Sequence, residues 1–481
     1  MKKKIIRACT VSMSVGFVKG MLPDLTKKYE VVLLSSPGPE MDEAREQYGV
    51  RTIEEPMERH ISPVKDFLSL CRLIRVFLRE KPDMVHSMTP KAGLLCMMAA
   101  WLTRVPVRIH TFTGLVFPTA TGLKRRILML TDAITCWCAT HVIPEGEGVK
   151  ADLLNNGITR KPLRVLGYGN VMGIDMDKFS VLSVECSKEC SVLSVECSGA
   201  KLKTQNSKLK TFTFLFVGRI VRDKGMNELM QAFQRLSDKY ANVRLVLVGR
   251  YEEDLDPISD KAKEIIDNNP NIDAVGPQYG DDLLAHYAAA DCFVFPSYRE
   301  GFPNTVLEAG AMGLPCIVTD INGSREIITD IFCHADLADH ADNLYFDHGS
   351  TRIHTDDNLT HADLADHADS LTTNDTDNFS RADLADHADS LTTDDTNDFL
   401  SRRSRRSRRF DLNKKLKTKA NGIIIPPKDA EALYEAMKLM VTDDGMREAM
   451  ARNARSMIES RFEQGFVRKC LYDFYEDILD S

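Results

Sequence analysis

Two glutamates lie on either side of a predicted helix start, and their spacing suits a ligand that carries both phosphate and hydroxyl groups. Glu300 comes directly before Gly301–Pro303, and Glu308 follows it at a distance of eight residues. The residues Thr305–Gly313 are predicted to be helical. Free N–H groups in a first helical turn bind anionic oxygen, whereas carboxylates accept hydrogen bonds from hydroxyls. On spacing alone, two solvated glutamates beside a helix end are an equally good interpretation.

A pair of cations forms a second candidate site. In Phe216–Gly225, which reads FVGRIVRDKG, a predicted strand ends at Gly218 and Arg219 follows at once. Lys224 lies five residues further on, just before a predicted helix. Doubly wound sheets bind ligands beyond the carboxyl ends of their strands, and two cations at that place suit a diphosphate. Taken alone, the motif is more typical of surface charges in a turn.

Short apolar runs alternate with helical patterns through the first half of the chain. The start, MKKKIIRA, predicts a strand rather than a signal peptide, because Arg7 interrupts the apolar part. Residues Pro63–Lys81 show helical periodicity after an N-cap serine and a proline. The apolar runs predict buried parallel strands at Glu30–Ser35, Met84–His86, Val107–Phe112 and Val142–Pro144.

A second alternating block begins at Thr211. Helices are predicted over Gly225–Tyr240, over Asp281–Ala290 and from Ala430 onward. Strands are predicted at 211–218, Arg244–Val248, Asp291–Phe295, Cys316–Thr319 and Gly422–Ile425. Two βα blocks in series indicate an α/β protein in which two doubly wound, Rossmann-like parallel sheets face each other across a cleft.

Internal repeats interrupt both blocks. SVLSVECS occurs at Ser180 and again at Ser191, and ADLADHAD occurs at Ala335, Ala362 and Ala382. The second repeat segment is polar and poor in large apolar residues, which favours disorder. The expected organisation is an N-terminal Rossmann-like domain (1–175), a linker insertion (180–208), a second Rossmann-like domain (209–330 and 421–459), a repetitive insertion (331–420) and a C-terminal helix that packs back on the first domain (460–481).

Composition excludes several classes of protein. The 481 residues carry a formal net charge of −8, which argues against nucleic acid as a partner. The twelve cysteines show neither a disulfide framework nor paired metal-ligand spacing, so reduced thiols in the cytoplasm are expected. No apolar run is long enough to span a bilayer. His334, Asp336, Asp339 and His340 could bind metal, but open polar repeats seldom form a closed site.

Taken in order, these motifs resemble those of family 4 glycosyltransferases, which have the GT-B fold, and in particular the bacterial capsule and O-antigen type. The matching segments of the second half are VGRIVRDKG, EGFPNTVLE, GSREII and NGIIIPPKD. In the first half they are RHISPVKDFLSL, KPDMVHSMTPKAGLL, TGLKRRILMLTD and NVMGIDMDKF. The resemblance covers nearly the whole chain except the repeats. It implies that 1–175 is the acceptor-side domain and that 209–330 with 421–459 is the nucleotide-sugar-binding domain.

The resemblance implies a retaining transfer of a sugar from a nucleotide-diphosphate donor to an undecaprenyl-diphosphate-linked saccharide, and a UDP-linked donor is expected for this chain. Neither a metal ion nor another cofactor is expected. The implied catalytic residues are Arg219, Lys224 and Glu300, and Glu308 would hold the ribose hydroxyls. The remaining implied donor contacts are Gly218, Gly301, Phe302, Pro303 and Asn304. Such an enzyme would be cytoplasmic and could lie on the inner face of the membrane.

The acceptor side departs from the family pattern. Relatives often carry a histidine in a T-x-H-G motif, and Thr113 of IHTFTG stands at that place. His86 is as well explained by a buried structural role as by an acceptor contact. The candidate acceptor or sugar contacts are Ser14, Gly16, His86, Lys91, His110 and Thr113. The helix that starts with Lys124–Arg126 could rest on anionic lipid, although a core helix with a solvated basic end is favoured over that role.

Two other functions compete with transfer. A sugar-nucleotide epimerase could use the same architecture. The repeats and the missing histidine also allow a catalytically inactive scaffold that binds nucleotide sugar.

Overall fold

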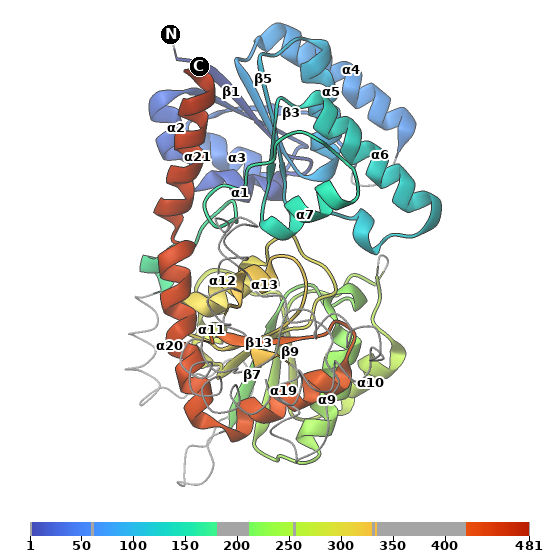
Figure 1. Ribbon diagram of the computed structural model, residues 1–481, viewed down its shortest axis with the longest axis vertical. Coiled ribbons are helices and arrows are strands. Elements are labelled where there is room, and N and C mark those ends of the chain that lie inside the picture. Colours follow the sequence, from blue (N-terminus) through green and yellow to red (C-terminus); the bar gives the residue numbers. More distant parts are fainter. Residues whose placement is uncertain are drawn as a thin grey trace, which may run out of the picture. The chain divides into compact units, whose positions relative to one another are not determined.

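The computed structural model describes residues 2–58, 62–179, 211–253, 256–329, 332–333 and 420–480 (Figure 1). These residues belong to one compact unit, Met1–Leu337 with Lys419–Ser481, and the unit contains two parallel sheets. The predicted insertion 180–208 lies outside the described residues. So do His334, Asp336, Asp339 and His340.

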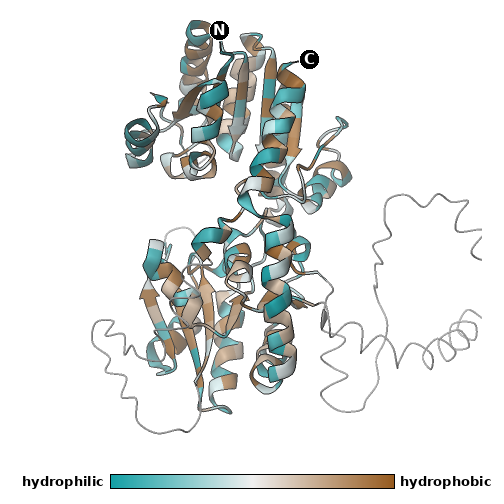
Figure 2. Cartoon of the chain, turned by 90° about the vertical axis from the view of Figure 1, so that its left-hand side faces the viewer, coloured by the Kyte–Doolittle hydropathy of each residue, from teal (hydrophilic) through white to brown (hydrophobic). Residues whose placement is uncertain are grey.

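The first sheet has six parallel strands in the order β3-β2-β1-β4-β5-β6. Five of them are mostly buried and apolar, which is typical of strands covered on both faces (Figure 2). The order reverses between β1 and β4, which is where doubly wound sheets place their ligand crevice. The strands are β1 (Lys4–Ala8), β2 (Glu30–Ser35), β3 (Arg51–Glu54), β4 (Met84–Met88), β5 (Val107–Phe112) and β6 (His141–Pro144).

Helices cover both faces of this first sheet. One hydrophobic cluster joins the sheet to α1 (Gly16–Lys19), α2 (Leu22–Lys28), α3 (Pro39–Tyr48) and the C-terminal α21 (Gln464–Leu479). A second cluster joins the opposite face to α4 (Pro63–Glu80), α5 (Pro90–Leu102), α6 (Gly122–Cys138) and α7 (Glu147–Asn155). Short 3₁₀ turns, η1 (Ser12–Val15) and η2 (Phe117–Thr119), follow β1 and β5.

The second sheet repeats the topology with seven parallel strands in the order β12-β13-β11-β10-β7-β8-β9. Its strands are β7 (Phe212–Val217), β8 (Val243–Val248), β9 (Ile272–Gly276), β10 (Cys292–Phe295), β11 (Cys316–Thr319), β12 (Phe332–Cys333) and β13 (Gly422–Ile425). The order reverses between β7 and β10, so the loops after these two strands meet at one edge of the sheet. Those loops contain Arg219 and Glu300.

The helices of the second sheet share one hydrophobic cluster with its strands. Helix α12 packs against α20, and α9 packs against α19 and α10. The 3₁₀ turn η3 (Arg222–Lys224) leads into α9. The helices are α9 (Met226–Ser237), α10 (Asp260–Asn268), α11 (Gly280–Ala289), α12 (Asn304–Ala311), α13 (Ser324–Ile327), α19 (Ala430–Thr442) and α20 (Asp444–Arg461).

The last helix returns to the first sheet. Phe474 and Tyr475 of α21 belong to the cluster formed with β1 and β2, and the Tyr475 ring lies 6.4 Å from the ring of Tyr29. The C-terminus therefore packs over strands that begin the chain (Figure 1).

Candidate functional site

A cavity of about 620 Å³ lies where the loops after β7 and β10 meet the loop after β5. Arg219, Lys224 and Glu300, which were predicted to act together, all line it. The remaining lining residues are Pro90, Thr113, Gly114, Leu115, Val116, Asp223, Ser297, Arg299 and Gly301. The cavity thus lies between the place where the strand order of the second sheet reverses and residues that follow strands of the first sheet.

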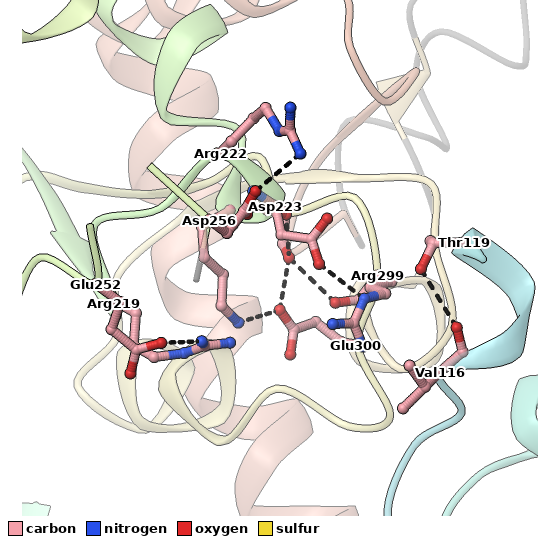
Figure 3. A network of polar contacts seen from close by, with 11 residues as sticks. Val116, Thr119, Arg219, Arg222, Asp223, Glu252, Asp256, Arg299 and Glu300 are labelled. Atoms are coloured by element: carbon pink, nitrogen blue, oxygen red, sulfur yellow. Dashed lines mark hydrogen bonds and ion pairs between the residues drawn. The ribbon is translucent and has the colours of Figure 1, made fainter. Parts of the chain in front are cut away.

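Lys224 and Glu300 both line this cavity and form an ion pair (Figure 3). The same carboxylate accepts a hydrogen bond from Ser297 Oγ at 2.6 Å, and Ser297 is fully buried. The Lys224 ammonium also lies 4.9 Å from the centre of the Phe295 ring. An apolar wall behind a charged pair strengthens its field toward the open side of the cavity.

Arg219 is held at the edge of the cavity by an ion pair with Glu252 at 2.6 Å. Glu252 also contacts Arg250 at 3.2 Å. A diphosphate that reaches Arg219 must therefore compete with a carboxylate, as it must at Lys224.

A second network braces the loop that carries Glu300. Arg299 Nε donates to Asp223 Oδ2 at 2.8 Å (Figure 3). The Tyr298 N–H donates to the Asp223 carbonyl at 2.8 Å. The Asp223 N–H in turn donates to Asp256 Oδ2 at 2.6 Å. These bonds tie the loop after β10 to η3, so Glu300 and Lys224 keep their relative position.

Two glycines allow this close packing. Gly225 has a φ of +71°, and a side chain there would meet the Pro296 carbonyl oxygen. At Gly301 an added Cβ would lie 2.2 Å from the Thr113 carbonyl oxygen. The loop that follows β10 can therefore approach the loop that follows β5 only with glycine at position 301.

Glu308 is not among the residues that line this cavity. It lines a second cavity of about 700 Å³ together with Gly16, Asn304 and Lys178. The physical reason is that Gly301–Pro303 stand between the two glutamates: Gly301 packs against Thr113, and Phe302 is buried against Phe462. Tyr287 donates a hydrogen bond to Glu308 at 2.9 Å. Burial raises the pKa of Glu308, and the Tyr287 bond opposes that rise.

The predicted histidines are engaged inside the protein. His86 is 1% exposed and contacts Tyr475 Oη at 2.5 Å and Thr111 Oγ1 at 2.7 Å. Burial, with the nearby Arg7 charge, holds the pKa of His86 well below its usual range. His110 shares a hydrogen bond with Ser87 Oγ at 2.9 Å, and burial lowers its pKa to about 3. Both geometries favour structural roles.

The other acceptor candidates are dispersed. Lys91 is paired with Asp66 at 2.6 Å. Ser14 lies in η1, where its carbonyl accepts from Cys9 Sγ, and Gly16 lines the second cavity. Of the candidates on the acceptor side, Thr113 lines the same cavity as Lys224.

Two glutamates near the site were not predicted. Glu145 follows β6, is 3% exposed, and has its pKa raised well above the usual range by burial and by Glu326 and Glu300. The Glu326 carboxylate accepts from the N–H groups of Glu147 and Gly148 at 2.7 and 3.0 Å, so it caps the start of α7. The PEGEG sequence after β6 is the signal that could have indicated the first of these residues.

Cations fixed in a cavity can bind a diphosphate and stabilise the charge that develops when a glycosyl phosphate bond breaks. Among the described residues, no cluster of three or more histidine, cysteine, aspartate or glutamate side chains could hold a metal ion. No described helix is both long and apolar enough to cross a membrane.

Two family models match the chain. The model for glycosyl transferases group 1 matches residues 200–388, and the glycosyl transferase 4-like domain matches residues 25–169. A capsular polysaccharide biosynthesis glycosyltransferase of Staphylococcus aureus, CapM, is 33% identical over 68% of this chain and 82% of its own length. The UDP-Gal:alpha-D-GlcNAc-diphosphoundecaprenol alpha-1,3-galactosyltransferase of Escherichia coli is 28% identical over 57% of this chain and 67% of its own length.

The architecture also matches solved structures. The Anabaena HepE structure in complex with UDP-glucose has a TM-score of 0.63, with 12% identity, over 98% of this chain and 99% of that one. At this identity the likeness concerns the fold. Together, the two parallel sheets, the ordered motifs and the relative at 33% identity show that this chain is a member of glycosyltransferase family 4 with the GT-B fold.

Proposed function

We propose that this glycosyltransferase moves a sugar from a UDP-sugar to an undecaprenyl-diphosphate-linked saccharide, with retention of configuration and without a metal ion. The product would be a unit of capsule, O-antigen or exopolysaccharide. The observation that supports this proposal best is the shared cavity of Arg219, Lys224 and Glu300. The E. coli relative, which transfers galactose from UDP-Gal to a diphosphoundecaprenol-linked GlcNAc, suggests the classes of donor and acceptor.

In this proposal the donor diphosphate takes over the two cations. It displaces Glu252 from Arg219 and Glu300 from Lys224, because phosphate oxygens make charge-assisted hydrogen bonds at least as strong as those of carboxylates. The cations then neutralise the leaving UDP as the glycosyl bond breaks. Glu300, released from Lys224 but still bonded to Ser297, accepts hydrogen bonds from hydroxyls of the transferred sugar.

The nucleoside end is assigned to the second cavity. Glu300 and Glu308 lie before and within α12, so a donor that crosses the N-terminus of this helix reaches both cavities. Asn304 and Glu308 would then bind the ribose, and the helix N-terminus would favour the nearby phosphate charge. The remaining predicted donor contacts, Gly218, Phe302 and Pro303, shape this path.

Transfer to a lipid-linked acceptor places the enzyme on the cytoplasmic face of the membrane. The acceptor saccharide would enter the first cavity beside Thr113, which supplies a hydroxyl where relatives carry histidine. The acceptor's own diphosphate and lipid would lie outside the cavity.

The test is transfer from radiolabelled UDP-sugars to a synthetic undecaprenyl-diphosphate saccharide or a short-chain analogue. Lys224→Ala and Glu300→Gln should each lower kcat/KM by about 10²–10³-fold, by analogy with the loss of one oxyanion donor. Lys261→Ala, an exposed lysine of α10, is the matched control and should behave as wild type. Wild-type turnover in either site variant contradicts the assigned roles.

The competing functions give different results in the same assay. Isomerisation of UDP-sugar without any acceptor would identify an epimerase. UDP-sugar binding by thermal shift, with neither transfer nor hydrolysis, would identify an inactive scaffold.

A further inference from the structure

Helix α4 carries an apolar stripe that faces away from the sheet. Its buried contacts come from Ser69, Leu73 and Phe77, yet Val64 and Phe67 are 75% and 64% exposed. Leu68 and Leu78 are also more than half exposed. Positions 64, 67, 68 and 78 fall on one side of a helix with 3.6 residues per turn. The sequence pattern of α4 therefore contains two apolar faces, of which the sheet covers one.

Helix α6 has the same construction. Thr135 and Cys136 are buried, whereas another side of the helix exposes large apolar residues at intervals of three, four and seven. Leu123 and Trp137 are 73% and 61% exposed, and Ile127 and Leu130 lie between them on the same stripe. An outward apolar stripe on one surface helix is ordinary, but two on neighbouring helices form a patch.

Helix α5 connects the two stripes. It contacts both α4 and α6, and the three helices lie side by side over one face of the first sheet (Figure 1). At its end Trp101 and Leu102 are exposed, and the Trp101 ring lies 4.8 Å from the Trp137 ring. We call this patch the α4–α6 surface; it comprises Val64, Phe67, Leu68, Leu78, Trp101, Leu102, Leu123, Ile127, Leu130 and Trp137.

The charge around this surface is positive although the chain as a whole is at −8. The three helices contain eight basic and three acidic residues. Of the acidic residues, Asp66 is paired with Lys91, Glu80 is paired with Arg51, and burial raises the pKa of Asp132 to about 7. Five basic residues on or beside these helices are exposed and do not occur in the ion pairs of the described residues: Arg75, Arg79, Arg104, Lys124 and Arg126.

We propose that the α4–α6 surface binds the face of an anionic phospholipid bilayer. Apolar side chains with two tryptophans can enter the headgroup region, where aromatic rings are favoured, while the surrounding cations pair with lipid phosphate. A protein partner would have to present acidic groups around an apolar face of its own, whereas an anionic bilayer supplies phosphate charge and an apolar layer together. The proposed contact is with the surface of the bilayer, and no described helix could span it.

The position of the surface fits the reaction, and this step depends on the proposed function. Helix α5 begins at Pro90, and the loop Thr113–Val116 leads toward α6; both Pro90 and this loop line the first cavity. Membrane contact through α4–α6 would thus bring lipid-linked acceptors to the side of the cavity that is formed by the first sheet.

Vesicle flotation tests the contact without any turnover. The full chain is mixed with vesicles of phosphatidylcholine alone or with phosphatidylglycerol added. We expect binding to the anionic vesicles and a loss of at least about tenfold in Phe67→Ser/Leu130→Ser. Tyr279→Ser, which removes an exposed aromatic residue beyond this surface, is the control and should bind as wild type. Partial release at about 0.5 M salt would show the charge contribution.

Three results would overturn the proposal: absence of binding by the wild type, unchanged binding by the double variant, or a dimer in solution that the double variant dissociates. The last result would make the surface an interface between two copies of the chain. Transfer to a water-soluble acceptor analogue should be unchanged in the double variant. That measurement separates failure of membrane binding from failure of the proposed function, which would abolish transfer to this acceptor in the wild type as well.

Discussion

The carboxyl edges of the two sheets have the same topology but differ in how their polar groups are used. In the first sheet, Arg7, His86 and His110 lie within β1, β4 and β5 and are almost fully buried. In the second, Arg219, Lys224 and Glu300 line an open cavity. Strand order alone therefore does not create a ligand site, because protein side chains can fill the carboxyl edge of a sheet or leave it open to a ligand.

What fills the first edge is the last helix of the chain. Tyr475 of α21 contacts both His86 and Arg7, so a residue from the C-terminus satisfies polar groups of β1 and β4. In the second sheet, Arg219 forms an ion pair with Glu252, and Lys224 forms one with Glu300. A charged ligand can exchange with these carboxylates, whereas nothing small can replace Tyr475.

The largest expected effect on this comparison comes from His86→Ala. It removes the partner of both Tyr475 and Thr111 in a buried place, which should destabilise the protein by about 2–4 kcal/mol. The melting temperature should fall by about 5–10 °C, while kcat of the folded enzyme stays near the wild-type value. Tyr475→Phe, which removes the other end of one bond, should show a smaller fall. A lost kcat with unchanged unfolding would make His86 an acceptor residue instead.

Much of the fold follows from the sequence, because buried parallel strands are continuous apolar runs. Glu30–Ser35, Val107–Phe112, Cys316–Thr319 and Gly422–Ile425 have the predicted bounds. The strand Arg51–Glu54 was missed because it lies at the sheet edge and carries polar residues. The edge strand β9 was missed for the same reason.

The site was predictable in part. Lys224 and Glu300 meet because β7 and β10 are neighbours in the sheet, which the alternating pattern implies. The separation of Glu308 depends on how Gly301 packs against Thr113, and no periodicity encodes that contact. Likewise, the apolar spacing of α4 does not reveal which of its two faces meets the sheet.

The pH dependence of stability provides the next contrast. His110 has a pKa of about 3 in the folded protein against roughly 6.5 when unfolded. Below pH 6.5 the unfolded chain therefore binds a proton that the folded one does not, and stability falls as pH falls. Between pH 7 and 5 this loss is about 2 kcal/mol. In thermal melts over this pH range, the stability of His110→Gln should fall less with falling pH than that of the wild type.

Glu145 acts in the opposite direction. Its raised pKa means that the folded state keeps a proton that the unfolded state has released, so stability rises as pH falls toward the unfolded value. Glu145→Gln should therefore make stability fall more steeply with falling pH, whereas His110→Gln should make it fall less steeply. Equal slopes in wild type and both variants would contradict the buried titrations.

On the donor side, Glu308→Gln should raise the donor KM by about tenfold and leave kcat within about threefold. The reason is that an amide oxygen accepts weaker hydrogen bonds from ribose hydroxyls than a carboxylate does. Tyr287→Phe, which removes the group that orients Glu308 at 2.9 Å, should give a smaller change in the same direction. A fall in kcat alone would instead place Glu308 at the reacting sugar.

The smallest predicted effect tests whether the carboxylates that pair with the cations at the carboxyl edge of the second sheet can be displaced by the donor. Glu252 competes with the donor diphosphate for Arg219, so Glu252→Gln should lower the donor KM by about two- to fivefold, the range of a partly exposed ion pair. Glu253→Gln is the matched control, since Glu253 pairs with Lys263 at 2.8 Å instead. The gain should shrink at high salt, which screens the pair. A raised KM would mean that Glu252 positions Arg219 for the donor rather than competing with it, and the second edge would then resemble the first in having a fixed polar network.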